Sequence, residues 1–450
     1  MSYESKSRFS TTRPNAEVEA GAWSLKALIA VLLIAFVVRA VWLLNVNTMP
    51  VTDFHWYYQR AMDMADGGGY SVDGQPTAYW PVGYPGFLAL FFKFIKPTIT
   101  FAKLLNFLLV MGSIALSFRI AHRLFRSNAV AIISSLLLCF HLNWIAYSGI
   151  LASEPLYALL TLWGTWLLLT GGNDKGRWTI AGFLFALATL VRPQAALIPL
   201  IVLICTAWHD GDDTEKLKLR KALSSVYVML LLVLSLWSVR NYLVFRTPIV
   251  VSTNMGDNLL IGNNTNATGG YMSPDGLDAS LTGLSEIDRN KAATKLATDY
   301  MTEHPWRTVK LWPTKVWNTF GRATDGPYWG FQKVAGQLAT PGTDEDKAQY
   351  LAVREYASWY HSALMLLFVV SVPGLLFVRR RVEPELHFPV LGLAMVGYVA
   401  FVSCVFFGNP RFAFAAMPFV AMYAGAMLVV VWKSLVPTKS ESPDPWGSGL

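Results

Sequence analysis

The stretch AWSLKALIAVLLIAFVVRAVWLL, residues 22–44, decides the class of protein to which this chain belongs. Apart from Lys26 and Arg39 it carries no charge, and about 20 such residues form a helix long enough to cross a bilayer. The stretch is too long for the apolar core of a secretion signal, and no small-residue cleavage site follows it. It therefore predicts a membrane-spanning helix that is not cleaved off.

The composition of the whole chain extends this prediction. Of 450 residues, 54% are hydrophobic and only 15% are charged, whereas soluble proteins carry about 25% charged residues. We predict an all-α polytopic membrane protein with about ten transmembrane helices. After residues 22–44, the predicted spans are 98–118, 129–146, 153–170, 178–191, 194–208, 222–242, 359–378, 386–407 and 412–432. A shorter run between prolines, residues 84–95, is expected to be re-entrant or interfacial.

The net charge of +8 does not indicate a nucleic-acid partner, because much of the excess lies in short loops between spans. Lysine and arginine are typical of cytoplasmic loops, and an N-terminus inside the cell places every cluster on that side. The clusters are Arg119, Arg123 and Arg126; Lys175 and Arg177; Lys216, Lys218, Arg220 and Lys221; Arg379, Arg380 and Arg381; and Lys433 and Lys439. We therefore predict an integral protein of the plasma (inner) membrane with both termini cytoplasmic.

This orientation divides the chain into parts. Residues 1–21 and 437–450 are polar cytoplasmic tails that are expected to be disordered. Residues 22–245 form an N-terminal transmembrane module whose first extracytoplasmic loop is 47–97, and residues 359–436 form the C-terminal transmembrane helices. Residues 246–358 make a small extracytoplasmic loop domain, since an unstructured connection of that length is uncommon.

Two segments of the loop domain have helical patterns. Residues 286–301 repeat apolar positions at helical spacing and end before Pro305. The next segment, WRTVKLWPTKVWNTF (306–320), places three tryptophans on a basic amphipathic stretch. That composition predicts a helix at the level of the lipid headgroups, and ordinary packing within a small outer domain is the alternative.

Carboxylates at the mouths of spans are costly in a membrane and indicate function. In TDFHWYYQRAMDMADGGGY (52–70), Asp53 follows the first span, and Glu154 opens the fourth predicted span. Capping of a helix that begins at Phe54 is the structural alternative for Asp53. The alternative for Glu154 is a favourable place in a first helical turn that Pro155 begins. His55 is a further candidate, although an exposed interfacial histidine is more often a bystander.

Arginines gather at the same predicted face, where guanidinium groups suit phosphate oxygens. For Arg192 and Arg411, the alternative is that their side chains only extend to the lipid headgroups and have no further role. Arg39 lies deeper, so its alternative is an internal salt bridge, and Arg240 is a weaker candidate near the end of its span. The set indicates binding of a lipid phosphate, with a carboxylate as the general base for an incoming hydroxyl or amine.

The order of these motifs resembles the GT-C superfamily of integral-membrane glycosyltransferases, in particular protein O-mannosyltransferases and the transferases that add aminoarabinose to lipid A. The resemblance rests on Arg39 and Asp53, YWPVGYPGFLAL at 79–90, SEPLY at 153–157, LVRPQ at 190–194, RNYLVFRTPIVVSTNMGDNLLIGNNTNATGGY at 240–271 and NPRFAFAAMPF at 409–419. It covers most of the chain in the right order. Single motifs are weak, but residues 240–271 are fairly specific.

The resemblance implies sugar transfer from a polyprenyl-phosphate donor to an extracytoplasmic glycolipid, polysaccharide or protein. It implies Asp53 as the base, Glu154 as a positioning acid, and donor-phosphate binding by arginines among Arg39, Arg192, Arg240 and Arg411. Many relatives carry a paired Asp-Glu, where this chain has Phe54 and His55 after Asp53. We thus expect a further group to complete the site. It is a second acid, His55, or a divalent metal ion held by Asp53, Glu154 and His55. Tyr79 is a further candidate for the site.

Other functions remain open at this point. A lipid-linked sugar flippase or transporter would need charges through the membrane midplane, whereas the polar set lies at one face. An oligosaccharide ligase or polymerase on a similar fold would differ in the length of the donor. A structural subunit of an envelope-assembly complex would tolerate loss of Asp53 and Glu154. The chain has no GxxxxGK phosphate loop, so ATP-driven activity is unsupported.

Overall fold

The computed structural model describes residues 14–207, 213–274, 276–377 and 389–436. The predicted tail 437–450, most of the tail 1–21 and the basic cluster Arg379–Arg381 lie outside the described residues. The prediction of an all-α polytopic membrane protein is confirmed. Within these residues, five helices are long and apolar enough to cross a membrane, and shorter apolar helices accompany them. The number of spans stays a prediction.

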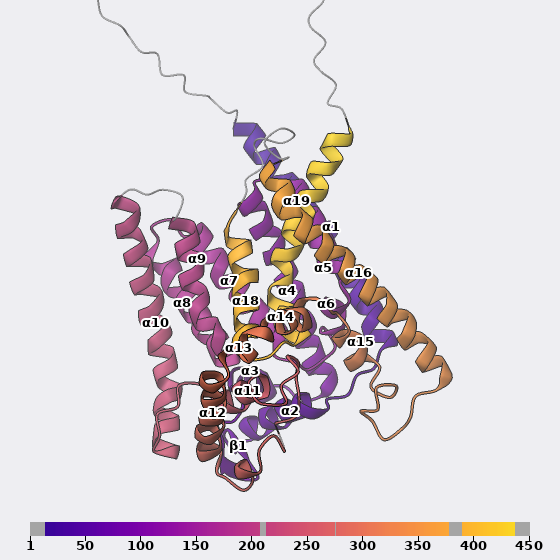
Figure 1. Cartoon of the computed structure of the whole chain (residues 1–450). Helices are drawn as coiled ribbons and strands as arrows, with labels where there is room; N and C mark the ends of the chain where they lie inside the picture. Colours follow the sequence, from indigo (N-terminus) through magenta and orange to yellow (C-terminus); the bar gives the residue numbers. More distant parts are fainter. Residues whose placement is uncertain (1–13, 208–212, 275, 378–388, 437–450) are drawn as a thin grey trace, which may run out of the picture.

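Each predicted span overlaps at least one helix. The long helices are α1 (Pro14–Asn45), α4 (Ile99–Phe125), α10 (Asp213–Phe245), α16 (Asp344–Phe377) and α19 (Met417–Leu435). The other predicted spans overlap the shorter helices α5 (Asn128–Phe140), α7 (Glu154–Thr170), α8 (Lys175–Val191), α9 (Ile198–Ala207) and α18 (Leu391–Val405). The start of α1 and the end of α19 lie at the same end of the helical assembly (Figure 1).

Close packing between these helices depends on small residues at two places. A Cβ atom at Gly182 of α8 would meet the backbone of Val226 in α10, and one at Gly425 of α19 would meet Ser134 of α5. The first pair brings α8 and α10 side by side, and the second brings α5 and α19 together, as their many contacts confirm. Close approach of backbones through small residues is typical of helix pairs in membranes.

The remaining elements gather at the opposite end of the molecule, away from the start of α1 (Figure 1). They include α2 (Thr52–Ala65), the two-stranded sheet of β1 (Ser71–Val72) and β2 (Gln75–Pro76), and α3 (Gly83–Phe92). The loop domain adds α11 (Met255–Gly262), η2 (Ala279–Leu281), α12 (Glu286–Glu303), α13 (Pro305–Lys310), α14 (Trp312–Phe320) and α15 (Asp325–Gly330). The predicted helix at 286–301 is confirmed as α12, which Ser285 caps by accepting from the amide of Asp288.

Several helices differ from their predicted bounds. The predicted span 129–146 is wrong as one helix, because α5 ends at Phe140 and α6 (Leu142–Ala146) begins anew after His141, whose backbone is extended. Helix α16 begins at Asp344 rather than near 359, because hydropathy detects only the apolar part of a helix that continues outside the bilayer. The amphipathic stretch 306–320 forms two helices, α13 and α14, and Trp306 and Trp317 are exposed.

Glu286 joins the loop domain to the first outer loop. Its Oε2 accepts from the Thr77 hydroxyl at 2.8 Å, and its Oε1 accepts from the Ala78 amide at 2.9 Å and from the Thr253 hydroxyl at 3.3 Å. One carboxylate therefore holds two segments that are far apart in the sequence.

A buried lysine connects the loop domain to a membrane helix. Lys315 donates to Asn263 Oδ1 at 3.1 Å and to the Cys404 carbonyl at 3.0 Å, which connects α14 to α11 and α18.

We expect Glu286→Ala to loosen the loop domain without unfolding the membrane helices. The Ala78 amide and two hydroxyls would lose their acceptor, and each unsatisfied polar group costs about 1–3 kcal/mol when it stays buried. Limited proteolysis of the purified protein in lipid should therefore cut residues 246–343 faster in the variant. Glu303→Ala, an exposed change at the end of α12, is the control. Equal cleavage of both variants would contradict the role given to Glu286.

Candidate active site

Four charged side chains from four elements meet in one cluster. Arg411 Nη1 donates to Asp53 Oδ2 at 2.8 Å, and Arg411 Nε donates to Glu154 Oε1 at 2.5 Å. Arg192 Nη2 donates to the same Glu154 oxygen at 2.6 Å. We call Asp53, Glu154, Arg192 and Arg411 the ion cluster; residues 358 positions apart in the chain meet in it.

The local sequence explains how two of these side chains reach the cluster. Residues before proline avoid the helical region, and Arg192 before Pro193 ends α8 in an extended conformation. Asn409 before Pro410 is also extended, and its side chain accepts from the Arg411 amide to begin the short 3-10 helix η3 (Pro410–Ala415). Both arginines thus sit at breaks between helices, where a side chain can turn toward the centre of the molecule.

Glu154 is the buried centre of the cluster. It lies in the first turn of α7 with Pro155 after it, as the sequence predicted, and its side chain is 1% exposed. Its Oε2 is buried and makes no hydrogen bond to the residues that the structure describes. A buried carboxylate oxygen without a donor is costly, so this oxygen is available to a hydrogen-bond donor on a ligand.

Asp53 is the more accessible carboxylate of the cluster, at 13% exposed. The alternative that Asp53 caps a helix is wrong, because Val51 is the N-cap of α2 and Asp53 lies inside the first turn. The carboxylate instead binds Arg411 and accepts from the Thr52 hydroxyl at 3.0 Å. Phe54, the next residue, is buried, and the Arg411 guanidinium carbon lies over its ring, 5.0 Å from the ring centroid.

The other predicted site residues lie elsewhere. Arg39 is fully buried and donates to the carbonyls of Ala35, Leu138 and Cys139, so it does not form a salt bridge with the described residues. Arg240 donates to the carbonyls of Tyr70 and Thr77. The structure brings neither arginine into the ion cluster, and their predicted phosphate-binding role stays untested.

His55 and Tyr79 are also outside the ion cluster. His55 is exposed on α2. The Tyr79 hydroxyl donates to Asp257 Oδ2 at 2.6 Å in the loop domain, where Arg289 also binds Asp257. Among the described residues, no three His, Cys, Asp or Glu side chains are grouped so that they could hold a metal ion. Arg411 binds both Asp53 and Glu154, and the predicted divalent metal ion stays a prediction.

The sequence did not single out Asp325, which the structure places beside the cluster. This residue begins α15, and Tyr147 after α6 donates to its Oδ2 at 3.3 Å. The adjacent Gly326 amide donates to Asn143 Oδ1 at 2.9 Å, which fixes the start of α15 on α6. Trp329 of α15 packs edge-on against Phe54, with ring centroids 4.9 Å apart.

Asp325 also differs electrostatically from an ordinary surface acid. The pKa of its carboxyl group is raised to about 6, mainly by burial. The positive charge of Arg411 lowers this pKa, and the negative charges of Glu154 and Asp53 raise it. The residue as a whole keeps an intermediate exposure. Nothing in the local sequence, TDGPYWG, separates this acid from the other acids of the loop domain.

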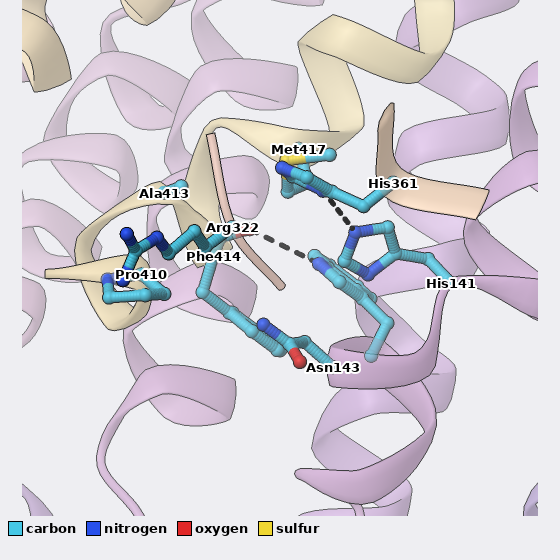
Figure 2. A pocket seen from close by; sticks show the side chains of 9 residues that line it. His141, Asn143, Arg322, His361, Pro410, Ala413, Phe414 and Met417 are labelled. Atoms are coloured by element: carbon cyan, nitrogen blue, oxygen red, sulfur yellow. Dashed lines mark hydrogen bonds between the residues drawn. The ribbon is translucent and has the colours of Figure 1, made fainter. Parts of the chain in front are cut away.

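A small pocket lies beside the cluster, and Figure 2 shows its lining. Pro410, Ala413 and Phe414 of η3 form one wall, and His141 and His361 face each other across a 3.2 Å contact between Nε2 and Nδ1. His361 Nε2 must carry its hydrogen, because it lies 2.6 Å from the Phe320 carbonyl. In neutral rings, His141 Nε2 then donates to His361 Nδ1, which leaves His141 Nδ1 as a buried acceptor without a partner among the described residues.

Comparisons with known proteins agree with this architecture. Residues 80–238, less than half of the chain, match the family model of dolichyl-phosphate-mannose-protein mannosyltransferase. The structure is similar to the oligosaccharyltransferase of Archaeoglobus fulgidus, solved with a tethered acceptor peptide, at 14% identity and a TM-score of 0.54 over 92% of this chain and 50% of that one. No curated protein sequence matches the chain.

Two further structures are similar. AglB of Archaeoglobus fulgidus, in complex with an inhibitory peptide and a dolichol-phosphate, has 14% identity and a TM-score of 0.51 over 92% of this chain and 51% of that one. ArnT of Cupriavidus metallidurans, bound to undecaprenyl phosphate, has 14% identity and a TM-score of 0.43 over 90% and 76%. The chain spans about half the length of the oligosaccharyltransferase structures. The similarity in structure shows that this chain is a membrane protein with a GT-C-like fold, as the sequence predicted, and residues 80–238 carry the family match within it.

We expect Glu154→Ala to destabilise the protein strongly. Two arginines would face each other without the anion between them, and removal of one partner from a buried ion pair costs about 3–5 kcal/mol. The thermal unfolding temperature of the protein in lipid nanodiscs should fall well below that of wild type. Glu355→Ala, at an exposed position of α16, is the control and should have little effect. An unchanged unfolding temperature for Glu154→Ala would show that the arginines are satisfied without Glu154.

Proposed function

We propose that the protein transfers a sugar from a polyprenyl-phosphate-linked donor to an extracytoplasmic acceptor. The observation that carries this proposal is the ion cluster, in which two arginines and two carboxylates meet at one end of the membrane helices in a GT-C fold. A lipid-linked donor would reach such a site from the bilayer, and an acceptor would reach it from outside. The sidedness rests on the distribution of lysine and arginine in the loops.

The arginines of the cluster are suited to the donor phosphate. A guanidinium group has five N–H donors, and the hydrogen bonds of Arg411 and Arg192 to described residues use only some of them. Both side chains keep some exposure, at 15% and 14%. They can thus bind phosphate oxygens bidentately and stabilise the charge that grows on the phosphate as it leaves. Such preorganised charge is often the largest catalytic contribution.

The proposed reaction is a direct displacement that inverts the anomeric carbon. A bond forms between the acceptor oxygen or nitrogen and that carbon, while the bond from the carbon to the phosphate oxygen breaks and its electron pair leaves with the lipid phosphate. Asp53 takes the proton of the acceptor. The phosphate is a good leaving group already, so no acid is needed to protonate it, in contrast to glycoside hydrolysis.

The ion pair between Asp53 and Arg411 suggests that the donor phosphate binds before Asp53 takes the proton of the acceptor. While Arg411 Nη1 donates to Asp53 Oδ2, that oxygen is occupied and cannot accept a hydrogen bond from the acceptor. A donor phosphate that binds Arg411 competes for the same guanidinium group and thereby frees Asp53. Glu154 keeps Arg192 as a partner throughout, and its second oxygen is available to a hydroxyl of the donor sugar.

The proposal is tested with the purified protein in liposomes that contain a panel of polyprenyl-phosphate sugars. Mass spectrometry follows donor consumption with glycolipid, polysaccharide and peptide acceptors, with and without a chelator to decide whether a divalent ion takes part. Loss of donor together with appearance of a glycosylated acceptor is the expected result. Movement of labelled lipid across the bilayer without any donor consumption would show a flippase instead.

A further inference from the structure

Tyr57 is a buried tyrosine of α2 that lies beside the ion cluster. It follows Asp53 by four residues, so one helical turn places the two side chains on the same face of α2. Tyr57 is only 5% exposed. Burial raises the pKa of its hydroxyl group, and the negative charges of Asp53 and Glu154 raise it further, whereas the positive charges of Arg411 and Arg192 lower it. The hydroxyl therefore lies where all four groups of the ion cluster act on it.

The Tyr57 hydroxyl makes no hydrogen bond to the residues that the structure describes. Three other buried tyrosines near the site each have a partner, namely Tyr70 on the Trp80 carbonyl, Tyr84 on Asn106 and Tyr147 on Asp325. A buried tyrosine hydroxyl usually finds such a partner, because a buried polar group without one is costly. A bound molecule can supply the partner that Tyr57 lacks.

Aromatic rings fix the direction of the Tyr57 side chain. The rings of Trp80 and Tyr84 pack edge-on against it, with ring centroids 6.0 and 5.5 Å away. Tyr84 belongs to α3, in which a Cβ atom at Gly83 would meet the backbone at the end of α8, just before Arg192. The same packing thus holds Tyr57 and Arg192 in a constant relation, and the hydroxyl is preorganised at the site.

The proposed reaction creates charge that the arginines alone do not match. The donor phosphate is a diester with one negative charge, and it leaves as a monoester that carries a second one. Asp53 and Glu154 already balance the charges of Arg411 and Arg192, so the ion cluster has no excess positive charge. A neutral hydrogen-bond donor can stabilise the new charge without a further ion. A tyrosine hydroxyl that keeps its proton at neutral pH is such a donor.

The chemistry of the site favours the phosphate over the acceptor as the partner of Tyr57. A hydrogen bond donated to the nucleophile would draw electron density from the atom that attacks, and would slow the reaction. The phosphate oxygens instead gain negative charge as their bond to the sugar breaks, so a donor to them binds the transition state more tightly than the ground state. Arg411 and Arg192, the proposed phosphate ligands, both act on the Tyr57 hydroxyl.

We propose that Tyr57 is a catalytic residue that donates a hydrogen bond to an oxygen of the departing phosphate, in addition to Arg411 and Arg192. This inference rests on the proposed transferase function and adds a residue to its machinery. Tyr57 keeps its own proton. The bond that forms, the bond that breaks and the transfer of the acceptor proton to Asp53 stay as described above.

The test compares wild type with Tyr57→Phe, which removes only the hydroxyl, as full chains in nanodiscs with the donor that the panel identifies. A hydrogen bond to a charged group is worth about a ten- to hundredfold change, and we expect kcat to fall by about that factor. The donor KM should change less than about threefold, because the bond strengthens only as the phosphate leaves. The affinity for polyprenyl phosphate should fall about tenfold at about pH 8, where its monoester carries close to two charges.

Tyr58→Phe is the matched control. Tyr58 is the next residue of α2 and is also buried, but burial alone raises its pKa, without a contribution from the ion cluster. This variant should keep the wild-type kcat and the wild-type affinity for polyprenyl phosphate. Thermal unfolding gives a second readout. Since no described residue bonds the Tyr57 hydroxyl, Tyr57→Phe should unfold at or above the wild-type temperature, whereas loss of a structural hydroxyl would lower it.

Several results would overturn this inference and leave the transferase proposal standing. They are a wild-type kcat in Tyr57→Phe, a lower kcat with unchanged affinity for polyprenyl phosphate, an equal loss in Tyr58→Phe, and a lower unfolding temperature of Tyr57→Phe. A rise in the acceptor KM in place of the loss of phosphate affinity would show that Tyr57 binds the acceptor instead. A wild-type protein that consumes no donor would overturn both proposals.

Discussion

Arg411→Ala should abolish sugar transfer, because one guanidinium group binds both carboxylates of the cluster and is proposed to bind the donor phosphate. Loss of an arginine that stabilises a transferred phosphoryl group costs about 10³–10⁵ in rate in other enzymes, and we expect a loss in transfer rate of at least about 10³ here. The variant would also leave Asp53 without its partner at 2.8 Å. Arg411→Lys keeps the charge but cannot bond Asp53 and Glu154 through two separate nitrogens, so it should recover little activity.

The matched comparison separates catalysis from stability. Arg354→Ala removes an exposed arginine from α16 and should leave transfer intact. The double variant Arg411→Ala with Asp53→Ala should unfold at a higher temperature than Arg411→Ala alone, because it removes the uncompensated carboxylate. Wild-type turnover by a folded Arg411→Ala protein would contradict the role of the ion cluster in binding the donor.

Asp53→Asn should remove transfer while the protein stays folded. The amide fills the same space and can still accept a hydrogen bond from Arg411 Nη1, but it cannot take a proton from the acceptor. General base catalysis contributes about 10²–10⁴ in rate, so turnover should fall at least a hundredfold at saturating donor and acceptor. The measurement is the initial rate of product formation by mass spectrometry, normalised to folded protein.

Asp63→Asn is the control for this variant. Asp63 lies on the same helix α2 and pairs with Arg60 at the surface, so its loss should leave the rate unchanged. Asp53→Asn should also keep its affinity for polyprenyl phosphate, because Arg411 and Arg192 remain. Full turnover by Asp53→Asn would show that another group takes the proton and would leave Asp53 as a structural partner of Arg411.

The apolar runs predicted the fold class well, since length and hydropathy alone identify helices that cross a bilayer. The bounds were less predictable where local geometry decides. His141 interrupts a run that is apolar on both sides, and its extended backbone depends on contacts with distant residues such as His361. The outer half of α16 was missed because a helix outside the membrane carries no continuous apolar signal.

The site was predictable in part for a similar reason. Asp53, Glu154, Arg192 and Arg411 stood out because a charge at the mouth of a span is unusual, and the structure brings these four together. Arg39 looked equally unusual in the sequence, but the carbonyls it binds belong to α1 and α5. Asp325 could not be found, since an acid in a polar loop is ordinary until the fold places it beside Arg411.

The most direct test of the central claim compares wild type, Asp53→Asn and Arg411→Ala in liposomes with the polyprenyl-phosphate sugar that wild type consumes. Mass spectrometry of the lipid and acceptor fractions measures polyprenyl phosphate and glycosylated acceptor, and NMR of the product gives its anomeric configuration. The account predicts that wild type forms the two products in equal amounts with an inverted anomeric centre, and that both variants form neither. Products with a retained anomeric centre, or equal product from Asp53→Asn, would contradict it.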